Sequence, residues 1–194
     1  KLPDCDYSPE KYDGPSKEEV SKLRGAFLTP SLVTYYQDPL MIVDGHMQYL
    51  FDEAGNRYLD GLAGIVSVSV GHCHPRVLAA VHKQNAILQH ATTIYLHPNI
   101  AKFAEKLVST LPKELNTVYF TNSGSEANDL AILMSRTYTK NYDVIALRNG
   151  YHGGSQGTMG LTALSTWKYS VPQGFGVHHA QVPDRYRGHF GYDD

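Results

Sequence analysis

Residues 117–147 follow the order strand, helix, strand. The β-rich run at 117–121 and the apolar run at 143–147 predict two buried strands. Between them, residues 125–139 carry Leu130, Leu133 and Met134 at helical spacing, which predicts a core-facing stripe. A strand–helix–strand unit favours a parallel sheet covered by helices, with ligands at the carboxyl ends of the strands. The sequence therefore predicts an α/β fold with candidate sites after residues 121 and 147.

The first candidate site reads Thr-Asn-Ser-Gly-Ser-Glu-Ala-Asn at residues 121–128. Ser123 with Glu126 three positions later is typical of a capping box, which would begin a helix there. The first N–H groups of a helix have no partner within it, and the helix dipole makes that end electropositive. Gly124 has no Cβ, so an anion could approach its backbone closely. The pattern predicts a phosphate site at Ser123, Gly124 and Ser125, with an ordinary helix cap as the alternative.

The second candidate site reads Arg-Asn-Gly-Tyr-His-Gly-Gly at residues 148–154. An aromatic side chain at a glycine-flanked strand end can lie flat against a planar heteroaromatic ring, which suits Tyr151. The alternative is that Tyr151 belongs to a hydrophobic core. His152 has two readings as well: it either lies near a ligand or hydrogen-bonds a loop.

The remaining chain has simpler signals. Residues 1–15 predict an extended arm, Ser16 with Glu19 predicts the start of a helix, and residues 41–59 predict a small β-meander with turns at Asp44-Gly45 and at 54–56. Pro75 favours the first turn of another helix, and one more is expected over 100–111. We expect a first domain over 1–70, comprising the arm, the helix and the meander segment. A ligand-binding α/β domain would begin at 71 and continue to 194.

Composition excludes several classes of function. The formal net charge is −2, from 17 basic and 19 acidic residues, and no basic block occurs, so nucleic acid and anionic membranes are poor partners. No apolar run has the length of a membrane span. Cys5 and Cys73 are the only cysteines, which argues against a disulfide scaffold. In the His72-Cys73-His74 triplet only the two histidines could share a metal, and no further ligand lies at a recognised spacing, so we expect no metal site.

Taken together, the motifs at 121–128 and 150–153 resemble the class III aminotransferases, enzymes of fold type I that depend on pyridoxal 5′-phosphate (PLP). The similarity extends over nearly the whole chain, including Gly-His-Cys-His-Pro at 71–75 and Tyr-Arg-Gly at 186–188. Within the class, the chain is most similar to mitochondrial members that transfer the amino group of L-alanine to glyoxylate. The resemblance implies the N-terminal part of a fold-type-I transferase, with a small β-meander segment and an incomplete, mainly parallel αβα large domain.

The resemblance also assigns site residues. Gly124 and Ser125 would bind the PLP phosphate, with Ser123 beside them, and Tyr151 would cover one face of the cofactor ring near His152. The lysine that forms the Schiff base in this family is expected beyond Asp194, so no catalytic residue is assigned here. Lys168 lies outside the family's lysine context, and the chain alone is therefore expected to be an inactive fragment. Three arginines could bind substrate carboxylates, although solvated or loop-bridging roles are the simpler reading: Arg148, Arg185 and Arg187.

The expected partners follow from the same resemblance. They are small amino-acid and 2-oxo-acid substrates, and a second copy of the chain in a homodimer or homotetramer, in mitochondria. Two alternatives remain open. One is another class III aminotransferase, acting on ornithine, 4-aminobutyrate or an ω-amino substrate; the other is a non-catalytic fold-type-I protein.

Overall fold

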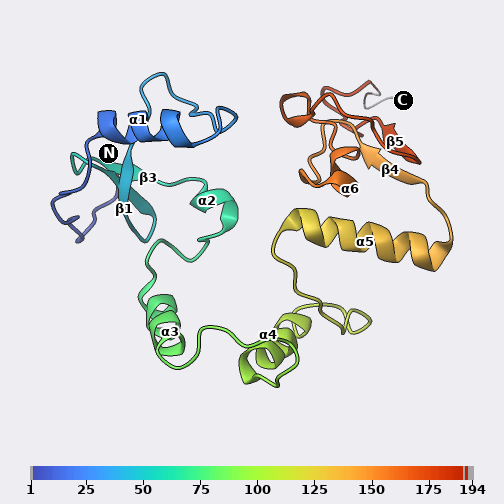
Figure 1. Cartoon of the computed structure of the whole chain (residues 1–194), viewed down its shortest axis with the longest axis horizontal. Coiled ribbons are helices and arrows are strands. Elements are labelled where there is room, and N and C mark those ends of the chain that lie inside the picture. Colours follow the sequence, from blue (N-terminus) through green and yellow to red (C-terminus); the bar gives the residue numbers. More distant parts are fainter. Residues whose placement is uncertain (1, 190, 192–194) are drawn as a thin grey trace. The chain divides into compact units, whose positions relative to one another are not determined.

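The computed structural model describes residues 2–189 and 191. The chain divides into two compact units, Lys1–Leu96 and His97–Asp194, and Figure 1 labels most of their elements. The division at residue 70 suggested by the sequence lies inside the first unit and stays a prediction. None of the helices in the described ranges is both long and apolar enough to cross a bilayer.

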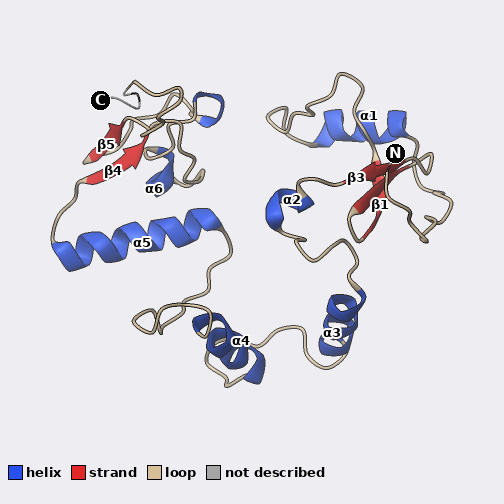
Figure 2. Ribbon diagram, turned by 180° about the vertical axis from the view of Figure 1, so that it is seen from behind, coloured by secondary structure: helices blue, strands red, loops and turns tan. Residues whose placement is uncertain are grey.

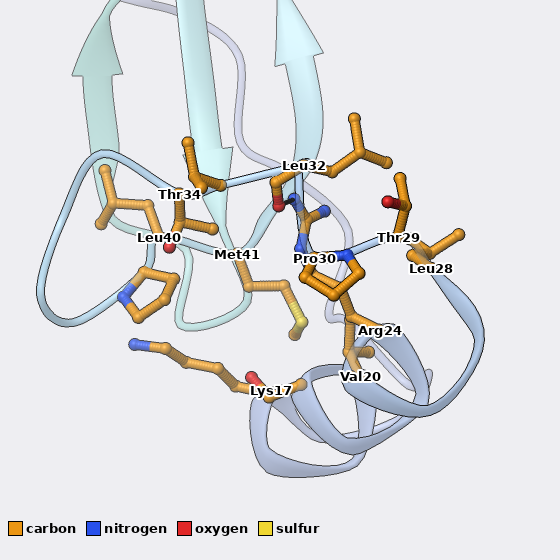
Figure 3. A pocket seen from close by; sticks show the side chains of 14 residues that line it. Lys17, Val20, Arg24, Leu28, Thr29, Pro30, Leu32, Thr34, Leu40 and Met41 are labelled. Atoms are coloured by element: carbon orange, nitrogen blue, oxygen red, sulfur yellow. Dashed lines mark hydrogen bonds between the residues drawn. The ribbon is translucent and has the colours of Figure 1, made fainter. Parts of the chain in front are cut away.

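Helix α1 of the first unit spans Lys17–Phe27, as its capping pattern predicts. The Ser16 hydroxyl accepts a hydrogen bond from the Glu19 amide at 3.2 Å, and the Leu28 amide closes the last turn on the Arg24 carbonyl. A pocket of about 630 Å³ lies between this helix and the segment that follows it. Figure 3 shows Lys17, Val20 and Arg24 of α1 facing the mainly apolar side chains of residues 28–41.

The β-meander is confirmed, with strands β1 (Ile42–His46), β2 (Tyr49–Asp52) and β3 (Arg57–Leu59) in antiparallel order. The predicted turn at Asp44-Gly45 is wrong, because both residues pair with β2 inside β1. The chain instead reverses between β1 and β2 at Met47, whose φ is 50°. The Asp44 carboxylate accepts a hydrogen bond from the Tyr7 hydroxyl at 2.8 Å, so this turn-type residue tethers the N-terminal arm.

The core of the first unit lies on β2. Tyr49 and Phe51 are each 2% exposed, and the ring of Tyr7 stacks on His46 with centroids 4.2 Å apart. Asp52 is buried beside them, where its carboxylate accepts four hydrogen bonds, from the amides of Ala54 and Asn56 and from the side chains of Asn56 and Tyr58. Burial of Asp52 favours its neutral form, but these donors outweigh it and lower the pKa of the carboxyl below its ordinary value.

The stretch between the meander and the second helix pattern contains α2 (Ala63–Val66), a short turn in which Gly64 and Ile65 have left-handed backbone angles. Helix α3 (Pro75–Asn85) then begins with proline in its first turn, as predicted. The Asp60 carboxylate joins the two ends of this stretch: it accepts hydrogen bonds from the Leu62 and Ala63 amides and lies 2.7 Å from the His72 ring nitrogen.

The second unit begins with α4 (Pro98–Val108), which ends three residues before the predicted limit. The predicted strand at 117–121 is wrong: these residues pair with no other strand of the described chain. A strand is defined by its hydrogen-bonded neighbour, so an apolar run without one stays an irregular extended segment. Phe120 of this segment stacks on Phe103 of α4, with ring centroids 5.2 Å apart.

Helix α5 spans Gly124–Thr139, close to the predicted bounds, and packs against the short helix α6 (Gln156–Met159). Its predicted core stripe is not buried, since Leu133 and Met134 are exposed. Strand β4 (Val144–Leu147) is confirmed and pairs in parallel with β5 (Val177–Ala180), which the sequence did not suggest. Figure 2 shows this pair of strands beside α6.

The core of the second unit is formed by β4, α6 and the segment after α6. Ala146 and Leu161 are buried together with two threonines, Thr158 and Thr162. The 3₁₀ turn η1 (Ser165–Trp167) follows this segment. This core therefore lies next to the loop that leaves the carboxyl end of β4.

Candidate active site

The N-terminus of α5 is built by the motif at 121–128. The Ser123 hydroxyl accepts a hydrogen bond from the Glu126 amide at 3.2 Å, as the predicted cap requires. The Glu126 carboxylate reaches back one residue further than in a standard capping box, accepting the Asn122 amide at 2.8 Å. Glu126 therefore ties down the turn, and its charge is partly satisfied by backbone instead of being directed at a ligand.

The amides of Gly124 and Ser125 donate no hydrogen bond within the described residues. Gly124 also faces open space, because a Cβ built on it would meet no heavy atom within 4 Å. Unpaired N–H groups at the positive end of a 16-residue helix form an anion site of the kind that holds phosphate groups. The structure thus leaves the predicted donors accessible.

The two sequence motifs meet in space. The Asn128 side-chain amide donates to the His152 carbonyl at 2.8 Å, and the Gly154 amide donates to the Ser125 hydroxyl at 3.2 Å. Gly153 lies between these contacts with a φ of +123°, a conformation that only glycine adopts without strain. The first turn of α5 and the loop after β4 therefore form one surface.

The aromatic residue of this loop, Tyr151, is 57% exposed, so it is not the core residue of the alternative reading. Its ring makes an edge contact with Trp167, with centroids 6.1 Å apart and planes at 64°. His152 is less exposed, and its Nε2 atom is buried with no hydrogen-bond partner among the described residues. The loop thus presents an accessible phenol ring and one unsatisfied imidazole nitrogen.

The other candidate residues have separate roles. His72 pairs with Asp60, and this hydrogen bond, followed by the Leu62 and Ala63 amides, lowers the pKa of the Asp60 carboxyl. Within the described residues, no three metal-binding side chains come together. The Lys168 ammonium donates to the Thr162 carbonyl at 3.0 Å.

Two of the three arginines line a second hollow. Arg148 and Arg187 border a pocket of about 530 Å³ at the carboxyl ends of β4 and β5, together with the Asp184 carboxylate. The Asp184 carboxylate accepts the amides of Tyr186 and Arg187 and so shapes the loop after β5. This hollow is distinct from the surface formed by α5 and the 151–154 loop, and Arg185 does not line it.

Three residues of the site had no role in the sequence-based reading. Asn128 lies in the first motif, where its position one helical turn after Ser125 was a usable signal for a contact from the same face. Thr162 and Trp167 lie outside both motifs. Thr162 and Trp167 reach the Tyr151 loop only because the chain folds back after α6, and hydrophobic periodicity does not predict such a fold-back.

Residues 33–190 match the family model of aminotransferase class III, and the chain belongs to this family. It is 53% identical over 193 residues to alanine–glyoxylate aminotransferase 2 homolog 2, mitochondrial, of Arabidopsis thaliana, and 44% identical over 191 residues to alanine–glyoxylate aminotransferase 2, mitochondrial, of Homo sapiens. These matches include 100% and 98% of this chain but only 40% and 37% of the two relatives.

Solved structures agree with the fold class. An amine transaminase from an uncultivated Pseudomonas species, solved in its PLP-bound form, is 30% identical, with a TM-score of 0.73 over 83% of this chain and 39% of that one. The mixed α/β arrangement described above is that of the N-terminal part of a PLP-dependent aminotransferase of fold type I, as predicted.

Proposed function

We propose that this chain forms the cofactor-anchoring part of a PLP-dependent class III aminotransferase. The observation that carries the proposal is the pair of unpaired amides at Gly124 and Ser125, beside the loop that presents Tyr151. Membership of the family and the similarity to a PLP-bound transaminase support it.

The residues present fit the cofactor in three respects. The α5 N-terminus offers free donors and a positive dipole to a phosphate dianion. The Tyr151 ring is accessible for stacking on a pyridine, and the buried Nε2 of His152 still needs a polar partner. When bound, PLP supplies an electron sink for the negative charge that develops at the substrate Cα.

This chain's own residues would hold and orient that group. Gly124 and Ser125 would bind the phosphate through backbone N–H groups, next to the Ser123 cap, while Tyr151 would limit tilting of the ring. A fixed ring selects which substrate bond lies parallel to the π orbitals, which is a positioning effect. No residue of the chain is assigned as the base or the covalent anchor.

The full reaction is proposed from the relatives. The names of the Arabidopsis and human proteins support transfer of an amino group from L-alanine to glyoxylate, and mitochondrial location. We also propose amino-acid and 2-oxo-acid substrates and a homodimer or homotetramer. The full-length protein should form pyruvate and glycine from L-alanine and glyoxylate. Higher activity with ornithine or 4-aminobutyrate would favour the other class III reaction, and no transfer with any donor would favour a non-catalytic protein.

Anchorage can be tested on a single N–H group. Gly124 is the first residue of α5, where proline is tolerated, and Ser123 already has the extended backbone that precedes proline. Gly124→Pro therefore removes one donor without breaking the helix, and Gly124→Ala is the matched control that keeps it.

In calorimetric titrations we expect PLP to bind about tenfold more weakly to Gly124→Pro than to Gly124→Ala, because one charge-assisted hydrogen bond is lost. Pyridoxal, which has no phosphate, should bind both variants equally. Equal PLP affinities in the two variants, or equal affinities for PLP and pyridoxal in the unmodified protein, would refute phosphate anchorage at α5.

A further inference from the structure

We propose that Thr162 is the residue that positions the Tyr151–Gly154 loop for cofactor binding, an inference that rests on the proposed function. Thr162 is 0% exposed. Its hydroxyl accepts the His152 amide at 3.0 Å and donates to the Gly153 carbonyl at 3.0 Å. One side chain thus binds two consecutive residues of the loop, one as acceptor and one as donor.

The loop needs such an anchor because no regular structure holds it. Residues 151–154 lie outside every helix and strand, and Gly153 has a left-handed φ. On one side the loop is bound by α5, through the Asn128 bond to the His152 carbonyl and the Ser125 bond to the Gly154 amide. Thr162 supplies the corresponding bonds from the core. The peptide groups directly after Tyr151 are therefore fixed from two directions.

Thr162 is also linked to the turn that carries Trp167, the aromatic neighbour of the Tyr151 ring. Its carbonyl accepts the Lys168 ammonium at 3.0 Å, next to Trp167, whose ring contacts Tyr151. The Thr162 amide donates a hydrogen bond to the Thr158 carbonyl at 3.1 Å, so Thr162 is also bound to α6. Thr162 thus binds both the backbone next to Tyr151 and the turn that carries Trp167.

If Thr162 only filled space in the core, any side chain of its shape could replace it. This separates a packing role from a positioning role that depends on the hydroxyl. Thr162→Val keeps the shape and removes the hydroxyl, whereas Thr162→Ser keeps the hydroxyl. Thr158→Val is the matched control, because Thr158 is also 0% exposed but its hydroxyl bonds to Ser155 instead of to the loop.

The test uses two readouts. Without cofactor, amide hydrogen exchange at His152 should be about tenfold faster in Thr162→Val than in Thr162→Ser or Thr158→Val. With cofactor, the affinity for PLP should fall about tenfold in Thr162→Val and be restored in Thr162→Ser. The unmodified protein provides a further measurement that needs no variant to fold: the His152 and Gly154 amides should exchange more slowly than the Tyr151 amide, which makes no hydrogen bond among the described residues.

The two proposals fail in different ways. If the unmodified protein binds no PLP while exchange at His152 depends on the Thr162 hydroxyl, the proposed function is wrong and the loop anchor stands. The positioning role is overturned if Thr162→Val and Thr158→Val change the exchange and the affinity equally, if Thr162→Ser fails to restore them, or if His152 and Tyr151 exchange at the same rate.

Discussion

Gly153→Ala should destabilise the second unit, because the backbone there has no room for a methyl group. At a φ of +123° an L-residue is strained whatever its surroundings. A Cβ at this position would also collide with the Ser125 hydroxyl, and would lie 2.8 Å from the Thr158 hydroxyl oxygen and 2.9 Å from the Ser125 Cβ. Ordinary contacts of a Cβ are at least 3.4 Å.

The two effects add to a sizeable loss of stability. Backbone strain of this kind costs about 1–3 kcal/mol, and crowding in a packed region costs about 1–3 kcal/mol more. A central expectation is a loss of about 3 kcal/mol in the free energy of unfolding. With a urea dependence of about 1–3 kcal/mol per molar, the unfolding midpoint should fall by about 1–3 M.

The midpoint can be followed by the fluorescence of Trp167, the only tryptophan of the chain, which reports on the second unit. Gly124→Ala is the control, since it adds the same methyl group in open space and should shift the midpoint little. Ser125→Ala combined with Gly153→Ala removes the colliding hydroxyl and should recover part of the loss, a coupling that a double-mutant cycle measures.

The reasoning fails if Gly153→Ala unfolds at the same urea concentration as the unmodified chain. It also fails if Gly124→Ala is destabilised as much, because the loss would then not arise from the contact between α5 and the loop.

Two further predictions concern other parts of the chain. Because the pKa of Asp52 is lowered in the folded state, its stabilising contribution is present above the unfolded-state pKa of about 4 and is lost as pH falls through the folded-state value. Asp52→Asn should reduce the free energy of unfolding by about 2 kcal/mol at pH 7, and this loss should become smaller as pH falls below about 4, as measured by urea unfolding; a loss that does not depend on pH would contradict this. Lys168 donates to a backbone carbonyl, and we expect it to react with PLP no more than exposed Lys113 or Lys140. Borohydride reduction and peptide mapping measure this, and stoichiometric labelling of Lys168 alone would assign it the anchoring role.

The sequence predicted those parts of the fold that local chemistry decides. Ser16 and Ser123 cap their helices through side-chain oxygens, and Pro75 begins α3 in its favoured first turn. The turn predicted at 54–56 lies between β2 and β3, where Gly55 has a left-handed φ of 80°. The first motif was also placed correctly at the start of α5, and the second at the end of β4.

What the sequence did not predict depends on long-range partners. Asp44 and Gly45 are good turn residues, but pairing with β2 and the bond to Tyr7 keep them in a strand. Strand β5 was missed because His178 and His179 interrupt its apolar pattern, although parallel pairing with β4 satisfies its backbone. Thr162 gave no signal at all, since a threonine becomes an anchor only when the fold brings a loop within 3 Å of it.

The two remaining errors, the strand at 117–121 and the core stripe of α5, have a common cause. Apolar patterning predicts that a surface will be covered, not which residues cover it. Among the described residues, no strand pairs with 117–121, and Leu133 and Met134 of α5 stay exposed, as does Tyr119. Along the chain, Tyr119 precedes the unpaired amides of Gly124 and Ser125, and Leu133 and Met134 follow them. The unpaired amides of Gly124 and Ser125, which we propose as the phosphate site, therefore depend on the local cap of α5 and not on burial of the neighbouring apolar side chains.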